Sequence, residues 1–188
     1  KAHLKQKYGK PGNVYLGVPH RLDRPVSGVV LFARNSKAAQ RLAEQFRDRQ
    51  VTKTYWGAIE GHLDPAEGVW EDWLRKIQDE SRAEISEPNA AGAKLASLRF
   101  RVLKAGVDCS LVEFQPLTGR MHQIRVQCAA RGHPLLGDVQ YGSVRSFGPS
   151  AELPRDRIIA LHARSLTFLH PIRYEPIMLT APLPLYWR

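Results

Sequence analysis

The chain has 188 residues, 43% of them hydrophobic, which fits one domain with a sizeable core. Its formal net charge of +10 favours a polyanionic partner, either a nucleic acid or an acidic membrane surface. No apolar run approaches the roughly 18 residues of a membrane span, and the first residues lack the apolar centre of a secretory signal. These features argue against a protein built on membrane-spanning helices.

We expect a single domain over residues 1–188, in which residues 1–12 form a basic arm or loop. The chain lacks an initiator Met, which leaves open whether an upstream segment is missing. Cys109 and Cys128 form no C-x-x-C pair and lie among apolar neighbours, so both are expected to be reduced core residues. A cytoplasmic location is therefore expected.

The first third of the chain predicts strands around one helix. Residues 28–33 are too apolar for a strand with one wet face, so a central strand is expected there. Asn35 or Ser36 caps a helix whose apolar positions 39, 42, 43 and 46 follow the helical period. Further expectations are a short strand over residues 13–18, a strand over 51–60 and a loop over 61–75.

The remaining chain predicts mostly strands. Residues 94–103 alternate apolar and polar side chains, and residues 108–115 are expected to pair with them as a hairpin. Residues 122–131 predict a helix that stops at Gly132. Late strands are expected within residues 157–169 and 177–180. Many strands with few helices predict an α+β domain with a mixed, largely antiparallel β-sheet.

Asp23 stands between Arg21 and Arg24 on a connection that leads into the apolar run. A carboxylate held against guanidinium groups stays ionised, and a loop acid on a rigid scaffold is a common site of chemistry. The same pattern also describes a surface ion pair of little energetic value. The local residues alone leave both interpretations open.

Three blocks of sequence together are more specific than Asp23 alone. They are residues 20–28 (HRLDRPVSG), 53–61 (KTYWGAIEG) and 117–126 (LTGRMHQIRV), the last followed by 132–138 (GHPLLGD). In this order they resemble the signature blocks of the RluA-type pseudouridine synthases. The resemblance extends from about residue 13 to the C-terminal residues. It implies a mixed sheet flanked by helices and divided by a central catalytic cleft.

The resemblance also implies roles for individual residues. Asp23 matches the essential aspartate of the family and Arg125 the arginine that pairs with it, although a helix-surface arginine is the ordinary alternative. Tyr55 matches the tyrosine that stacks on the target base and assists a proton at C5, although a core aromatic is the commoner fate. The implied substrate-binding residues are Arg21, Arg24, Ile124 and Leu136, with Arg21 filling the space that an everted base leaves.

The implied activity is isomerisation of specific uridines in ribosomal or transfer RNA. This reaction moves uracil from an N1 to a C5 link without redox chemistry or loss of a group, so no cofactor and no metal are expected. The expected partner is structured RNA, with no membrane and no obligatory protein partner, and the expected state is a monomer. Candidate phosphate contacts are Lys1, Lys5, Lys7, Lys10, Lys37, Arg41, Lys53 and Arg131.

Two positions depart from the family pattern, because Met121 replaces Thr or Ser and Gln127 replaces a frequent His. We expect both to tune activity rather than abolish it. Residues 137–138 and 141–142 are expected to shape a loop near the cleft. The histidines at 20, 122 and 133 show no metal-binding spacing and are expected to hold loops by hydrogen bonds.

Two other classes of protein stay open. One is a catalytically inactive RNA-binding domain on the same scaffold. The other is a glycoside hydrolase or base-excision enzyme, which would need two carboxylates, Asp23 and Asp138.

Overall fold

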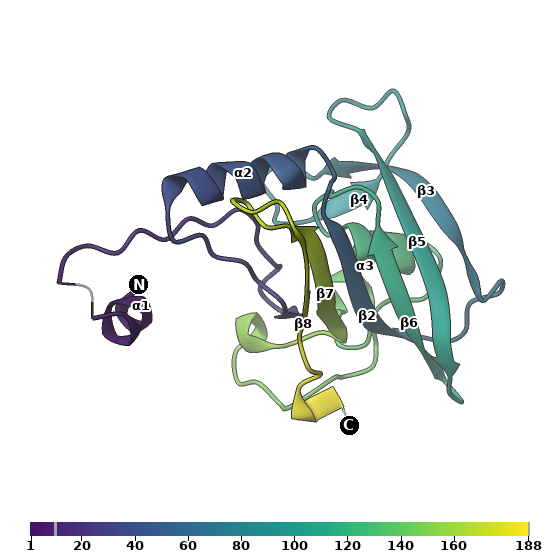
Figure 1. The fold of residues 1–188 in the computed structure, drawn as a ribbon. Coiled ribbons are helices and arrows are strands. Elements are labelled where there is room, and N and C mark those ends of the chain that lie inside the picture. The colour runs from purple at the N-terminus through teal and green to yellow at the C-terminus, as the bar shows by residue number, and fades with distance from the viewer. Residues whose placement is uncertain (10, 188) are drawn as a thin grey trace.

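The computed structural model describes residues 1–9 and 11–187, and it has the α+β architecture that the sequence predicts (Figure 1). One sheet has the strand order β1-β7-β2-β6-β5-β3-β4, with β8 also paired to β7. The β1–β7 pairing is parallel, and the other pairings among the described residues are antiparallel. The strands are β1 Ser27–Gly28, β2 Thr52–Glu60, β3 Glu67–Lys76, β4 Ala83–Ile85, β5 Lys94–Ala105, β6 Cys109–Pro116, β7 Leu161–Leu169 and β8 Pro176–Thr180.

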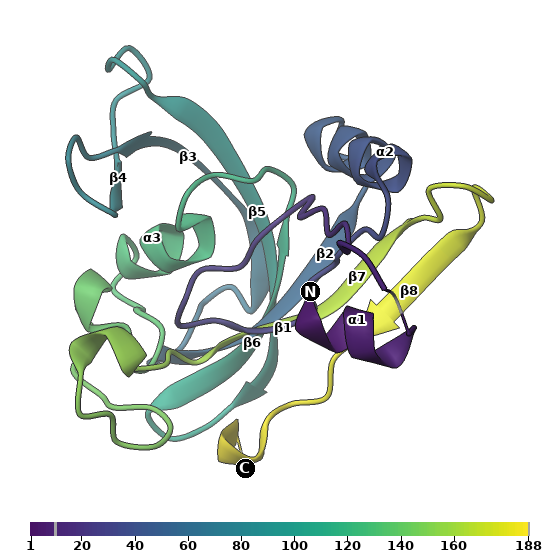
Figure 2. The ribbon, with the colours of Figure 1, turned by 90° about the vertical axis from the view of Figure 1, so that its left-hand side faces the viewer.

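Three α-helices and three short 3₁₀ turns complete the described chain. The helices are α1 Ala2–Lys7, α2 Ser36–Arg47 and α3 Gln123–Ala129, and the turns are η1 Val139–Tyr141, η2 Pro154–Asp156 and η3 Leu185–Trp187. Figure 2 shows the segment before β1 passing between α3 and α2, with the curved sheet behind it. None of the described helices is long and apolar enough to cross a membrane.

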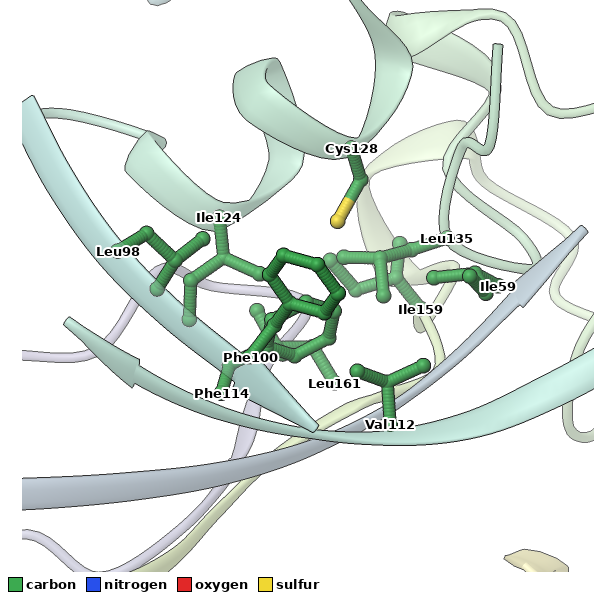
Figure 3. Packing of buried hydrophobic residues seen from close by; sticks show 10 residues of the cluster. All are labelled: Ile59, Leu98, Phe100, Val112, Phe114, Ile124, Cys128, Leu135, Ile159 and Leu161. Atoms are coloured by element: carbon green, nitrogen blue, oxygen red, sulfur yellow. The ribbon is translucent and has the colours of Figure 1, made fainter. Parts of the chain in front are cut away.

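The main core lies between the sheet and α3. Ile124 and Cys128 of α3 pack against inward-facing side chains of β2, β5, β6 and β7 (Figure 3). A second cluster joins Leu42 of α2 to Leu166 and Phe168 of β7. Both cysteines are free, with Cys128 buried and Cys109 half-buried. Burial raises the pKa of the Cys128 thiol, which keeps it in the unreactive protonated form.

Several expected elements form as predicted. Helix α2 is capped by Asn35, whose side-chain oxygen accepts a hydrogen bond from the Ala38 amide at 2.8 Å. Strands β2, β5 and β6 and helix α3 occupy the regions predicted for them, and β5 pairs with β6 as a hairpin. The late strands β7 and β8 also form, although β7 begins at Leu161.

The central strand predicted over residues 28–33 is wrong. Strand β1 stops at Gly28 and lies at the edge of the sheet. Beyond it, Leu31 and Ala33 are buried whereas Val30 and Phe32 are 36% and 54% exposed, so one face of this apolar run stays uncovered. Gly28 adopts φ +125°, and a Cβ there would clash with the Ala163 carbonyl oxygen, so glycine is required where β1 meets β7.

The loop predicted over residues 61–75 is confirmed only for residues 61–66, because β3 begins at Glu67 and its residues 67–74 pair with β5. Gly68 lies over the ring of Phe100, and Trp70 packs on the same ring with centroids 4.3 Å apart. Gly68 is therefore a close-packing position within a strand, not a loop signal.

Two further expectations need correction. Residues 13–18 contribute an isolated bridge between Gly17 and Ala33 instead of a strand. The predicted basic arm over residues 1–12 contains helix α1, which has no buried residue. Lys10, one of the expected phosphate contacts, lies outside the described residues.

Candidate active site

A cavity of about 600 Å³ opens on the face of the sheet that carries α2 and α3. Its walls come from the segment before β1, the C-terminal end of α2, strand β2 and residues 115–125. Three of the sequence blocks, far apart in the chain, therefore meet at one cavity. Of the predicted site residues, those that line it are Arg21, Asp23, Tyr55, Ile124 and Arg125.

The Asp23 loop is fixed by contacts at both ends. Before it, the Leu31 amide donates a hydrogen bond to Nε2 of His20 at 2.8 Å, and the His20 ring stacks on Phe46. After it, the Val26 amide donates to the Asp23 carbonyl oxygen at 3.0 Å, and Ser27 enters β1. These contacts hold the Asp23 carboxylate at the cavity wall, where its side chain remains 35% exposed.

Asp23 and Arg125 lie together, as the resemblance implies. One carboxylate oxygen of Asp23 is 3.8 Å from Nη1 of Arg125 and 3.7 Å from Nε2 of His122. Arg125 is 4% exposed and is therefore not the helix-surface arginine of the alternative interpretation. Opposite charges at this separation attract, although the contact is longer than a hydrogen bond.

The closest partner of Arg125 is Asp138, whose role sequence reasoning missed. The guanidinium Nε and Nη2 each donate to a carboxylate oxygen of Asp138 at 2.7 Å, and Nη2 also donates to Gln140 at 2.8 Å. Burial by itself lowers the pKa of Arg125, but the hydrogen bonds and charge of Asp138, with help from Asp23, raise it overall. Asp138 is 1% exposed and fully engaged, so it is not free to act as a second catalytic carboxylate.

His122 lies between the Arg125 guanidinium and the Tyr141 hydroxyl. It precedes α3 with φ 51° and ψ 26°, a left-handed conformation that is uncommon for a residue with a side chain. Its Nδ1 lies 2.9 Å from the Tyr141 hydroxyl, and its Nε2 lies 3.3 Å from Nη1 of Arg125. The Tyr141 hydroxyl also accepts a hydrogen bond from the Ala83 amide, which ties β4 to this network.

Tyr55 projects from the inward face of β2 into the cavity. Burial raises the pKa of its phenol to about 12, and the charge of Asp23 adds to the rise. The phenol is therefore protonated at neutral pH, so it can donate a hydrogen bond but is not a base.

Two predicted substrate-binding residues lie outside the cavity lining. Arg24 is exposed and pairs with Asp156 at 3.2 Å. Leu136 forms backbone hydrogen bonds with Ala58 and Ala160, next to the sheet. The other two predicted substrate-binding residues, Arg21 and Ile124, do line the cavity, and Ile124 also belongs to the main core.

The other predicted polar residues have structural partners. His133 lies 2.9 Å from the Glu60 carbonyl oxygen through Nδ1, so the three histidines hold loops as expected. Gln127 of α3 donates a hydrogen bond to the Asp72 carboxylate of β3 at 2.6 Å, and Arg131 pairs with the same carboxylate at 3.0 Å. Across the described residues, no cluster of three His, Cys, Asp or Glu side chains suits a metal ion.

The buried state of His122 predicts a loss of stability in mild acid. Burial lowers its pKa, and the positive charge of Arg125 adds to this, while Asp23 and Asp138 oppose it. Below about pH 6.5 the unfolded chain takes up a proton that the folded chain resists, so the free energy of unfolding falls as the pH falls. Chemical denaturation between pH 7.5 and 5.5 measures this slope.

The His122→Asn variant isolates the contribution of this histidine, because asparagine tolerates the left-handed conformation. We expect a shallower pH dependence in the variant than in the wild type. His20 and His162 also have a pKa lowered by burial and supply part of the remaining slope. Parallel pH curves for the two proteins would show that His122 does not carry the effect.

Comparison with known proteins identifies the family of the chain. Residues 1–130 match the family described as RNA pseudouridylate synthase. Ribosomal large subunit pseudouridine synthase C of Vibrio cholerae is 35% identical over 174 residues, which cover 93% of this chain and 54% of that protein. tRNA pseudouridine synthase C of Haemophilus influenzae is 36% identical over 181 residues, which cover 90% of this chain and 74% of that protein.

Solved structures give the same result. Human RNA pseudouridylate synthase domain containing 4 superposes with a TM-score of 0.79 at 27% identity, covering 97% of this chain and 77% of that one. The chain therefore belongs to the RNA pseudouridylate synthase family, and the resemblance and fold class inferred from sequence are confirmed. It spans about half the length of the Vibrio cholerae relative.

Proposed function

We propose that this chain isomerises specific uridines in ribosomal or transfer RNA to pseudouridine, with Asp23 as the catalytic group and no cofactor. The observation that carries the proposal is the accessible Asp23 carboxylate, which faces a cavity beside Arg125, His122 and Tyr55. Relatives named as ribosomal large subunit and tRNA pseudouridine synthases support these two substrate classes.

The reaction needs little from the protein beyond one carboxylate and a shaped cavity. The N1–C1′ bond breaks, the uracil turns over, and C5 bonds to C1′ while the C5 proton leaves and N1 gains a proton. Atoms and electrons balance without an external reagent. A carboxylate can attack the sugar or the base, or take up a proton. The position of Asp23 in the cavity lining, with a partly exposed carboxylate, supports a role in one of these steps.

The neighbours of Asp23 suit this chemistry. Arg125, fixed by Asp138, keeps a positive charge beside the carboxylate without bonding to it directly. Tyr55 offers a flat ring for stacking and a protonated hydroxyl. Ile124 supplies an apolar wall for the base.

Arg21 and Arg24 suit contacts with the RNA around the cavity. A uridine inside folded RNA must leave its stack to reach Asp23, at a cost of a few kcal/mol. Arg21 lines the cavity mouth and can occupy the vacated space. Arg24 can exchange its exposed partner Asp156 for a phosphate at little energetic cost. We infer that the chain acts as a monomer in the cytoplasm, and the free cysteines support that location.

The test is incubation of the purified chain with ribosomal and transfer RNA transcripts labelled with tritium at uracil C5. Release of tritium to water, with no free uracil, is the expected result, because the C5 proton is lost when the new bond forms. Pseudouridine mapping of the same RNA then identifies the uridine. Release of free uracil would instead indicate a glycosidase. RNA binding without either product would indicate an inactive binding domain.

A further inference from the structure

Several cationic side chains line the cavity, and one of them, Lys53, is half-buried on a strand of the sheet. Lys53 lies on β2, two residues before Tyr55 and on the same face of the strand, and it lines the cavity. Its ammonium donates a hydrogen bond to the Thr118 carbonyl oxygen at 3.3 Å. It forms no ion pair within 4.0 Å in the part of the chain that the structure describes.

The surroundings of Lys53 make this charge costly. Burial lowers the pKa of Lys53, and the positive charge of Arg49 lowers it further. Lys53 in turn helps to lower the pKa of His20, next to burial. Lys53 is half-buried, so its ammonium has lost part of its contact with water, and only a negative group would fully compensate that loss. One hydrogen bond to a neutral carbonyl does not supply that compensation.

The other cations predicted to contact phosphate differ from Lys53. Those that the structure describes do not line the cavity. Arg131 is paired with Asp72, and Arg41 donates to the Pro171 carbonyl oxygen. Lys53 is thus distinguished by its position, and Arg49, which follows α2 in a left-handed conformation with φ 59°, lines the cavity beside it.

We propose that the Lys53 ammonium binds a backbone phosphate of the nucleotide whose base enters the cavity, with Arg49 flanking it. The proposal rests on the proposed function, since it assigns a part of the substrate to a part of the same cavity. Residues 53 and 55 leave the strand on one face about 7 Å apart. This spacing lets Tyr55 meet the base while Lys53 meets the phosphate of one nucleotide.

The experiment compares the binding of uridine 3′,5′-bisphosphate and uridine, followed by NMR titration. The proteins are the wild type, Lys53→Met, Lys53→Arg and the control Lys104→Met, which removes an exposed charge outside the cavity lining. The wild type is expected to prefer the bisphosphate. Lys53→Met should reduce that preference about tenfold and lower the salt dependence of RNA binding by about one phosphate contact. Lys53→Arg and Lys104→Met should keep the wild-type preference for the bisphosphate and the wild-type salt dependence of RNA binding.

Thermal unfolding separates binding from folding. Lys53→Met should unfold at the same or a higher temperature, because it removes a desolvated charge. A lower unfolding temperature with unchanged preference for the bisphosphate would show that Lys53 has only a structural role, through its hydrogen bond to Thr118. Equal weakening of uridine and bisphosphate would assign Lys53 to the base or ribose. Either outcome overturns the phosphate site.

Tritium release by the wild type distinguishes this proposal from the proposed function. Release of tritium without a Lys53-dependent preference for the bisphosphate overturns the phosphate site alone. A Lys53-dependent preference without tritium release overturns the isomerase activity and leaves the phosphate site standing.

Discussion

Replacement of Asp23 by asparagine is expected to lower the rate of pseudouridine formation by about 10⁴-fold or more. Asparagine keeps the shape of the side chain, but it cannot act as a nucleophile or take up a proton. RNA affinity should stay the same or rise, because the change removes a negative charge from a cavity that receives a polyanion. Single-turnover tritium release and RNA binding, measured on the same protein, check both expectations.

The matched control is Asp108→Asn, which removes an exposed carboxylate paired with Arg145 outside the cavity lining. Its activity should equal that of the wild type. The Asp23→Asn variant should fold normally, because the Asp23 carboxylate is partly exposed and makes no contact shorter than 3.7 Å to Arg125 or His122. Retention of RNA modification by Asp23→Asn would remove Asp23 from the catalytic role.

The sequence predicts the juxtaposition of Asp23 and Arg125 only through the family resemblance. Local reasoning favours a surface ion pair for Asp23 and a surface position for Arg125. The burial of Arg125 depends on α3 lying inside the curve of the sheet, which is a property of packing between segments far apart in the chain. Hydrophobic periodicity does not carry that information.

Asp138 shows the same limit in another way. A single aspartate after Gly137 in a turn has no local signal of its partner, 13 residues earlier in the chain. A buried carboxylate nevertheless requires a partner, and the short block 132–138 places this one close to α3. The bidentate geometry with Arg125 is visible only in the three-dimensional structure.

The errors in secondary structure have a common cause. Strand β3 escapes prediction because Gly68 and acidic residues look like loop signals, although Gly68 makes room for Phe100. Residues 28–33 resemble a strand at the centre of a sheet because they are apolar, although one side faces solvent. Composition predicts burial only when a neighbouring element covers the face. By contrast, helix α2 is predictable because its cap and its period are local features.

Replacement of Asp138 by asparagine is expected to be the most destabilising of these changes. It leaves the buried guanidinium of Arg125 without its closest counter-ion, and breaking a buried ion pair in this way costs about 3–5 kcal/mol. The domain has a free energy of unfolding on the order of 5–15 kcal/mol, so the loss is a large fraction of the total. Urea denaturation of the wild type and the variant measures it.

Activity should fall with stability, and more steeply than the folded fraction. Without Asp138, the Arg125 guanidinium is free to turn toward Asp23, 3.8 Å away, and to bond the carboxylate that the reaction needs. We expect tritium release per folded molecule to fall about 100-fold, a typical effect of misplacing a catalytic group. The measurement is made at a temperature where the variant remains folded.

A double variant separates the two effects. Adding Arg125→Met to Asp138→Asn removes the unpaired charge, so much of the lost stability should return, because an apolar side chain of similar length suits the buried position. Activity should not return, because the positive group beside Asp23 is gone. If Asp138→Asn alone is as stable as the wild type, Asp23 and Gln140 suffice as partners of Arg125, and the pairing with Asp138 is not what holds the guanidinium in place.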